Sequence, residues 1–98
     1  MRHEILLSPG AIRERKALHA HERATVDDAL ERFLRHEPTR VSKSRIKRLR
    51  GLQRPQYRLR VGEIRVFYDV TETSVEILAI VSKEQAERWL REEGEPET

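Results

Sequence analysis

The chain has 98 residues, of which 37% are hydrophobic and 38% are charged, and its formal net charge is +3. A chain of this length supports one small domain with one modest core. The absence of cysteine excludes disulfides, thiolate metal sites and a cysteine nucleophile. No apolar run is long enough for a signal peptide or a membrane span, so we expect a soluble cytoplasmic protein with no membrane partner.

Basic and acidic residues are segregated along the chain. Nine Lys and Arg residues and no Asp or Glu fall between Pro38 and Gly62, whereas acidic residues crowd the segment from Glu84 to Glu97. Scattered charges usually form a solvated surface. Segregation of this kind instead indicates a polyanionic partner, most simply nucleic acid, which is held by neutralisation of its phosphates.

The first third of the chain predicts a strand and two helices. Residues 5–7 favour a short strand, and Ser8-Pro9 is a good helix start, which predicts a first helix from Pro9 to about His21. Thr25 with Asp28 resembles a capping box and begins the second helix, which ends near Glu37. Its buried stripe follows the helical period: Val26, Ala29, Leu30, Phe33 and Leu34.

The segment from Val41 to Arg54 carries most of the positive charge, and we interpret it as a basic loop or short turn. Its cations are candidates for binding RNA, together with one lysine near the C-terminus. The predicted RNA-binding residues are Lys43, Arg45, Lys47, Arg48, Arg50 and Lys83.

The segment from Tyr57 to Tyr68 predicts a β-hairpin, because apolar and arginine side chains alternate on both sides of Gly62-Glu63. A two-residue turn there sets Val61 opposite Ile64, Arg60 opposite Arg65, Leu59 opposite Val66 and Arg58 opposite Phe67. One face is then apolar, and the other presents three arginines. Arginines directly opposite each other repel, so an anion between them is the natural arrangement, although solvent or acids elsewhere in the fold are the alternative.

The C-terminal third predicts a buried central strand at residues 75–81 and a last helix. Ser82 with Gln85 matches a capping box, and Ala86, Trp89 and Leu90 form one apolar stripe. Residues 94–98 are expected to be a loose acidic tail. The order of elements gives one domain over residues 1–98 in the α+β class.

The four histidines form no metal-ligand pattern, and we expect neither a metal nor a cofactor. Trp89 has two interpretations, as packing in the helical stripe or as a stacking platform for a base. Packing is favoured because Trp89 belongs to a regular stripe.

The segment 47–51 followed by residues 57–68 resembles the signature of the RelE/ParE family of bacterial type II toxin–antitoxin toxins. The resemblance implies a small fold with a twisted antiparallel sheet packed against two N-terminal helices, to which this chain adds a short C-terminal helix. It implies a cognate antitoxin as partner. RelE-like members cut mRNA in the ribosomal A site, whereas ParE-like members inhibit DNA gyrase, and a family member without toxicity is a third alternative.

The resemblance implies catalytic roles for Arg58, Arg60 and Arg65, which match basic positions of the RelE-like nucleases. Guanidinium groups fit phosphate oxygens well but are poor proton acceptors, because arginine stays charged. Ala86 and Leu90 stand where those nucleases carry an arginine and a tyrosine. Whether the chain is a metal-independent, ribosome-dependent endoribonuclease therefore stays open. The candidate replacements are Lys83 or Arg88 for the arginine, and Tyr57 or Tyr68 for the acid, although Tyr68 shares the apolar hairpin face.

Overall fold

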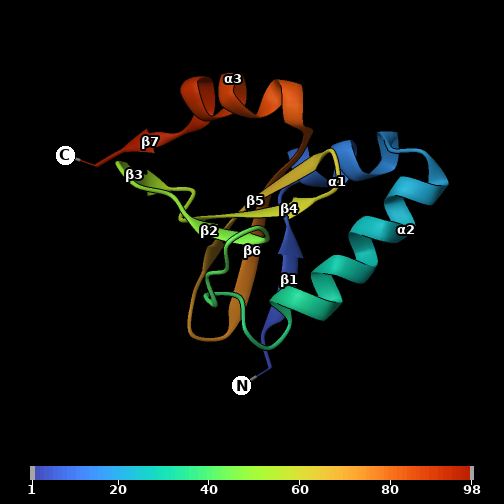
Figure 1. Cartoon of the computed structure of the whole chain (residues 1–98), viewed down its shortest axis with the longest axis horizontal. Coiled ribbons are helices and arrows are strands. Elements are labelled where there is room, and N and C mark those ends of the chain that lie inside the picture. Colours follow the sequence, from blue (N-terminus) through green and yellow to red (C-terminus); the bar gives the residue numbers. More distant parts are fainter. Residues whose placement is uncertain (1, 98) are drawn as a thin grey trace.

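The computed structural model describes residues 2–97, in which helices lie on opposite sides of a five-stranded main sheet and two further short strands form a separate sheet (Figure 1). The N-terminal half contains one strand and a helical pair: β1 (Glu4–Leu7), α1 (Pro9–Ala17), α2 (Ala20–Ala29) and a π-helical turn, η1 (Leu30–Leu34). The C-terminal half contains the remaining elements: β2 (Ile46–Arg48), β3 (Leu52–Arg54), β4 (Tyr57–Val61), β5 (Ile64–Val70), β6 (Ser74–Ser82), α3 (Lys83–Glu93) and β7 (Glu95–Pro96).

Five strands form the main sheet in the order β1-β6-β5-β4-β2. All neighbouring pairs are antiparallel except β1 and β6, which run parallel. The predicted α+β class, with two N-terminal helices on a mostly antiparallel sheet and a short C-terminal helix, is confirmed. The buried strand predicted at residues 75–81 is β6, which lies between β1 and β5.

The helices α1 and α2 cover one side of the sheet, which we call the helix face. The core on this face is continuous and includes Val26 and Leu34 from the helical pair and Leu59, Val66 and Ile77 from the sheet. The stripe predicted for the second helix is confirmed, since four of its five side chains are buried and Phe33 packs partly buried against them. Most of the apolar burial that stabilises the domain lies here.

The break between the two helices falls earlier in the chain than the sequence predicts. α1 ends at Ala17 and α2 begins at Ala20, whereas the expected start at Thr25 lies inside α2, where the Thr25 hydroxyl donates to the His21 carbonyl at 3.0 Å. The carboxylate of Glu22 accepts from the His19 amide at 3.4 Å at the new start. The helical run also ends at Leu34 rather than near Glu37.

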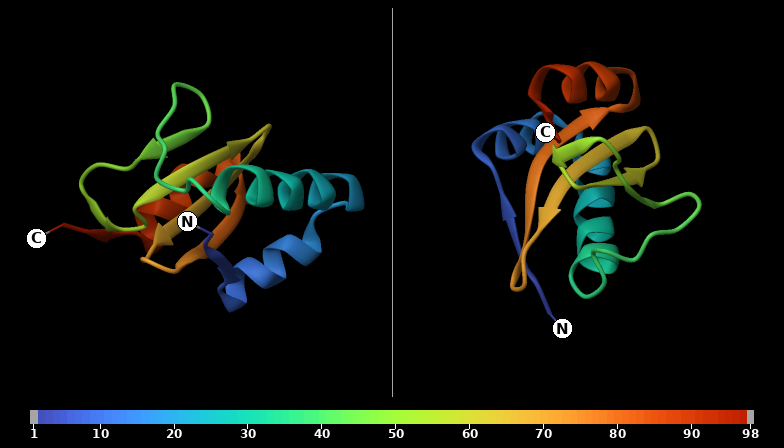
Figure 2. Two further views of the ribbon diagram at one scale, coloured as in Figure 1. Left: turned by 90° about the horizontal axis from the view of Figure 1, so that it is seen from below. Right: turned by 90° about the vertical axis from the view of Figure 1, so that its left-hand side faces the viewer.

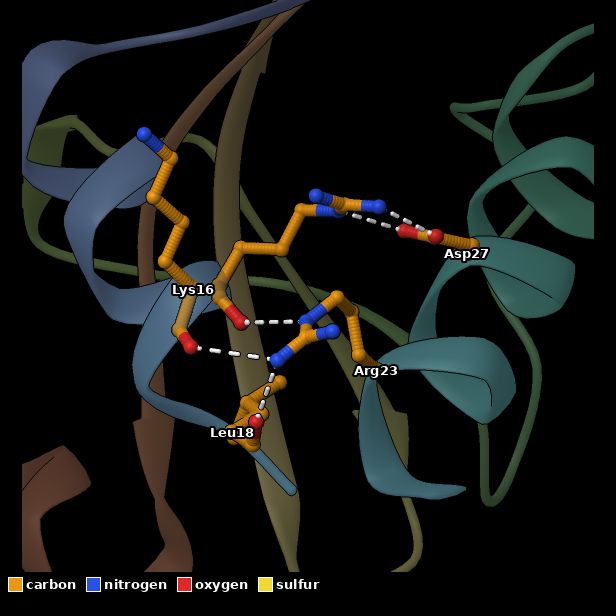
Figure 3. A network of polar contacts seen from close by, with 5 residues as sticks. Lys16, Leu18, Arg23 and Asp27 are labelled. Atoms are coloured by element: carbon orange, nitrogen blue, oxygen red, sulfur yellow. Dashed lines mark hydrogen bonds and ion pairs between the residues drawn. The ribbon is translucent and has the colours of Figure 1, made fainter. Parts of the chain in front are cut away.

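A guanidinium group holds this break in place (Figure 3). Arg23 on α2 donates to the carbonyls of Arg15, Lys16 and Leu18 at the end of α1, at 3.3, 3.2 and 2.8 Å. The last carbonyls of a helix lack partners within the helix, so a donor from the next helix satisfies them. Arg15 also forms a bidentate ion pair with Asp27, which ties α1 to α2.

Two expectations about irregular segments differ from the structure. The basic segment expected to be a loop contains two short strands, β2 and β3. Strand β2 pairs with β4, and β3 pairs with β7. The expected loose tail instead supplies β7, which pairs with β3, and the Glu97 amide donates to the Gly51 carbonyl at 3.2 Å. Thr98 lies outside the described residues.

The helices of residues 2–97 are all too short or too polar to cross a membrane.

Candidate nucleic-acid interface

The hairpin of β4 and β5 has the predicted register. Arg60 lies opposite Arg65, Arg58 lies opposite Phe67, and Val61 lies opposite Ile64 beside the turn. Gly62 in the turn has φ of 58°, a left-handed conformation that glycine adopts without strain. Because side chains alternate along a strand, Arg58, Arg60 and Arg65 share one side of the sheet, which we call the arginine face.

The three guanidinium groups are close enough to influence one another, and their side chains are held differently. Arg60 is exposed, whereas Arg58 and Arg65 are half-buried. The Arg65 guanidinium donates to the carbonyls of Gly62 at 2.8 Å and Ile64 at 3.1 Å. Burial lowers the pKa of Arg58 from its ordinary value, and the nearby charges of Arg65 and Arg60 lower it further.

Within residues 2–97, no carboxylate forms an ion pair with any of these three arginines. The buried Nε of Arg58 has no hydrogen-bond partner. Positive charges held together without an internal counter-ion are a costly arrangement for a fold, because each charge raises the free energy of the others. An external anion that neutralises them would lower that free energy.

Lys47 belongs to the same face, because β2 places it directly opposite Arg58. The sequence singled out Lys47 for RNA binding but gave no sign of β2, since a three-residue strand is too short to show a period. Two like-charged cross-strand pairs, Lys47 with Arg58 and Arg60 with Arg65, therefore lie side by side on strands β2, β4 and β5.

The other predicted RNA-binding residues do not pair across strands with this cluster, although Arg45 lines a hollow together with Arg60. Arg48 extends over the ring of Tyr57, with its guanidinium carbon 5.2 Å from the ring centroid, and Arg45 lies over Phe33 at 4.2 Å. Lys43 and Arg50 are exposed in the segments before and after β2, and Lys83 is exposed at the start of α3. The basic segment thus divides between the two sides of the sheet.

Neither tyrosine lies on the arginine face. Tyr68 is fully buried on the helix face, where its hydroxyl donates to the Pro38 carbonyl at 2.7 Å, and burial strongly raises its pKa. Tyr57 stacks on Tyr68 with 5.5 Å between ring centroids. A phenol held in this way cannot donate a proton to a phosphate on the opposite side of the sheet.

Helix α3 covers the part of the arginine face next to the arginines. The Trp89 ring stacks on Phe67 with 5.1 Å between centroids and 6° between planes. Ala86 and Leu90 pack on the same small cluster, which confirms the packing interpretation of Trp89. No residue of α3 is itself buried, so this cover is thin.

A carboxylate does occur at the far end of this face, beyond Phe67, but it is already engaged. One carboxylate oxygen of Asp69 accepts from the backbone N–H of Gln56 at 2.7 Å, and the other lies 3.3 Å from Arg54 Nε. Burial raises the pKa of Asp69, while the Gln56 and Arg54 contacts oppose that shift. Asp69 therefore stabilises the end of the hairpin and leaves the three arginines unneutralised.

The arrangement defines a small α+β protein with an uncompensated cationic face on a short sheet. Residues 5–87 match a family described as the ParE toxin of the type II toxin–antitoxin system parDE. The chain belongs to this family, and it is a toxin of a type II toxin–antitoxin system in the RelE/ParE group. The predicted membership is confirmed. No curated protein sequence matches the chain.

Solved structures with the same fold come from toxin–antitoxin complexes. The RelBE2 complex of Mycobacterium tuberculosis contains a chain that is 25% identical, with a TM-score of 0.65 and coverage of 84% of this chain and 99% of that one. The archaeal RelE–RelB complex of Pyrococcus horikoshii gives 22% identity, a TM-score of 0.63 and coverage of 85% and 97%. The RelB–RelE complex of Methanococcus jannaschii gives 15% identity, a TM-score of 0.59 and coverage of 86% of this chain and 96% of that one.

Proposed function

We propose that this toxin inhibits translation by binding RNA phosphates with its arginine face. The observation that carries the proposal is the gathering of Arg58, Arg60 and Arg65 on one side of the sheet without a carboxylate partner in the described chain. Arginine forks match the geometry of phosphate oxygens, and neutralising phosphates releases counterions, which favours binding. We include Lys47 in this surface because it lies opposite Arg58.

On a translating ribosome, the same surface would support metal-independent cleavage of mRNA. Attack by the ribose 2′-hydroxyl places extra negative charge on the phosphate, and the three guanidinium groups would stabilise that charge. They are poor proton acceptors, so the 2′-hydroxyl proton would pass to a group outside this set. The bond from phosphorus to the 5′-oxygen would break, and that oxygen would take a proton from a further group outside the set. Lys43, Arg45, Arg48, Arg50 and Lys83 would add contacts to ribosomal RNA around the site.

A second function, inhibition of DNA gyrase without catalysis, is favoured by two observations. The matched family is described by its ParE toxin, and both tyrosines of the chain lie on the helix face, away from the arginines. Inhibition by binding requires no proton transfer, so the lack of an acid and a base on this face would not impair it. The arginine face would then bind gyrase or its DNA.

We also propose a cognate antitoxin as the protein partner, and the cytoplasm as the place of action. The similar structures are complexes of RelE with RelB, and an acidic segment of an antitoxin would neutralise the arginine face as RNA does. Antitoxin and RNA would then compete for the same cations.

Controlled expression in a bacterium tests the proposal. We expect the wild-type chain to arrest growth, with transcripts cut only while they are being translated. Arg60→Ala with Arg65→Ala should abolish both effects. The matched control, Arg13→Ala with Arg91→Ala, removes two exposed arginines from α1 and α3 and should remain toxic. Intact transcripts with DNA damage and inhibition of purified gyrase would select the second function, and full toxicity of the Arg60 and Arg65 variant would contradict the assigned surface.

A further inference from the structure

A second cationic surface lies between the end of the helical pair and the loop that leads into β2. It is a groove of about 430 Å³, which we call the Phe33 groove. The loop stands out from the body beside η1 in both views of Figure 2. The lining of the groove includes Arg32, Phe33, His36, Arg40, Arg45 and Ile46.

Two arginines in this groove are positioned by an aromatic ring rather than by an acid. The guanidinium carbon of Arg45 lies 4.2 Å from the Phe33 ring centroid, and that of Arg32 lies 5.4 Å from it. Within residues 2–97, neither side chain forms an ion pair. A guanidinium stacked on a ring keeps the N–H donors in its own plane, so both arginines are oriented and still able to bind an anion.

The groove also offers apolar surface between these cations. Ile46 is buried at its base and Phe33 is half-buried. Val41, on the same loop, is 56% exposed, which makes it the most exposed large hydrophobic side chain in the described part of the protein. Apolar surface next to oriented cations fits a ligand that carries both an apolar side chain and carboxylates.

The groove lies on the other side of β2 from Lys47, although one of its residues, Arg45, also lines a hollow together with Arg60. Ile46 is part of the helix-face core, whereas its neighbour Lys47 lies opposite Arg58 on the arginine face. Strand β2 is the edge of the sheet and divides the two surfaces. An extended chain that crosses this edge can contact both surfaces without any change in the fold.

We propose that the Phe33 groove binds an acidic, extended segment of a partner protein. An apolar side chain of that segment packs against Phe33 and Ile46, and flanking carboxylates pair with Arg32 and Arg45. The inference rests on the proposed protein partner, not on what the arginine face binds. RNA fits the groove less well, because the buried Ile46 and the exposed Val41 side chain beside the cations offer contacts to an apolar side chain and none to a phosphate.

Selection of random sixteen-residue peptides displayed on phage tests the inference. The full chain with Arg60→Ala and Arg65→Ala is used for the selection, so that the arginine face captures fewer acidic peptides. We expect the recovered peptides to combine Asp or Glu with a large apolar residue. Arg32→Gln with Arg45→Gln removes both cations from exposed positions and should weaken binding of these peptides at least about tenfold, since charge-assisted hydrogen bonds are lost. Arg13→Gln with Arg91→Gln removes the same charge elsewhere and should change the affinity less than about twofold.

A second variant separates the apolar contact from the charges. Phe33→Leu keeps an apolar side chain but removes the ring that positions the arginines, and it should weaken peptide binding while the chain stays folded by circular dichroism. The inference is wrong if the recovered peptides bind the groove variants as tightly as they bind the wild type. It is also wrong if acidic peptides without an apolar residue are enriched equally, or if a twelve-nucleotide oligouridylate, rather than the peptides, loses affinity for the groove variants.

The arginine-face variant keeps this test distinct from that of the proposed function. Arg60→Ala with Arg65→Ala should bind the selected peptides with wild-type affinity, whereas its growth phenotype tests RNA binding. Arg32→Gln alone, which leaves Arg45 in place for RNA, should weaken peptide binding and retain growth arrest. If the arginine-face variant loses as much peptide affinity as the groove variants do, the groove is not a distinct binding site. The proposed function would be unaffected by that result.

Discussion

The helix face and the arginine face of the sheet satisfy their polar and charged groups in different ways. On the helix face, the buried Tyr68 hydroxyl is hydrogen-bonded within the fold, and the surrounding side chains are apolar. On the arginine face, like charges lie opposite each other, and the buried Nε of Arg58 lacks a partner. The same strands build both faces, because successive side chains alternate between them.

The difference indicates that the helix face stabilises the fold, whereas the arginine face is available for binding. Burial of apolar surface lowers the free energy of the folded state on the helix face, whereas the charges of the arginine face raise it. A fold tolerates such a face when the first contribution is much larger. Substitutions on the two faces should therefore change the free energy of unfolding by very different amounts, and the following variants are ordered by the size of that change.

Leu59→Ala, on the helix face, should have the largest effect. Leu59 is fully buried in the main core, and its truncation removes apolar contacts and leaves a cavity. We expect the free energy of unfolding, measured with urea, to fall by about 2–5 kcal/mol. A loss below about 1 kcal/mol would mean that the helix face is not the main source of stability.

Trp89→Ala should have an intermediate effect. Trp89 is half-buried and stacks on Phe67, so the loss should be about 1–2 kcal/mol rather than the full cost of a buried aromatic residue. Glu87→Ala on the exposed side of α3 is the control and should change stability by less than about 0.5 kcal/mol. An equal effect of the two substitutions would show that α3 does not dock on the arginine face.

The ion pair of Arg15 and Asp27 should contribute less, and in a pH-dependent way. The Arg15 hydrogen bond lowers the pKa of Asp27, so this contribution is present above about pH 4 and is lost as the pH falls through the lowered pKa. The side chains are 35% and 42% exposed, so a double-mutant cycle with Arg15→Ala and Asp27→Asn should give less than about 1 kcal/mol at pH 7. In acid unfolding monitored by fluorescence, Asp27→Asn should flatten the fall of stability below pH 4, and an unchanged profile would contradict the pairing.

Arg60→Gln should have the smallest effect, and it should have the opposite sign. Removing one charge from the pair with Arg65 relieves repulsion and should raise the free energy of unfolding by a few tenths of a kcal/mol at low salt. Added salt should reduce this gain. A clear fall in the free energy of unfolding, measured with urea, would show that Arg60 stabilises the fold, which contradicts its assignment to a ligand-binding surface.

Periodic segments of the sequence predicted the fold well. The hairpin and its register followed from alternation on both sides of Gly62, and the stripe from Val26 to Leu34 marked the buried side of α2. The same alternation predicted that Arg58, Arg60 and Arg65 share one face. These features depend on local patterns, which a single sequence displays directly.

Features that depend on distant contacts were not predictable. Strands β2, β3 and β7 have two or three residues each and are stabilised by their partners in the sheets, so they leave no period. The end of α1 depends on Arg23 from the next helix, and this cap displaced the expected boundary at Thr25. The Phe33 groove combines residues from η1 and the β2 loop, which only the folded chain brings together.

The affinity of the full chain for single-stranded RNA, measured as a function of salt concentration, tests the central claim most directly. Each phosphate neutralised on a single strand contributes about −0.7 to the slope of log K against log salt. We predict that Arg60→Ala with Arg65→Ala reduces the magnitude of the slope by about 1.4, and that Arg13→Ala with Arg91→Ala leaves it unchanged. Equal slopes for the two double variants would contradict the assignment of the arginine face as the surface that binds phosphate.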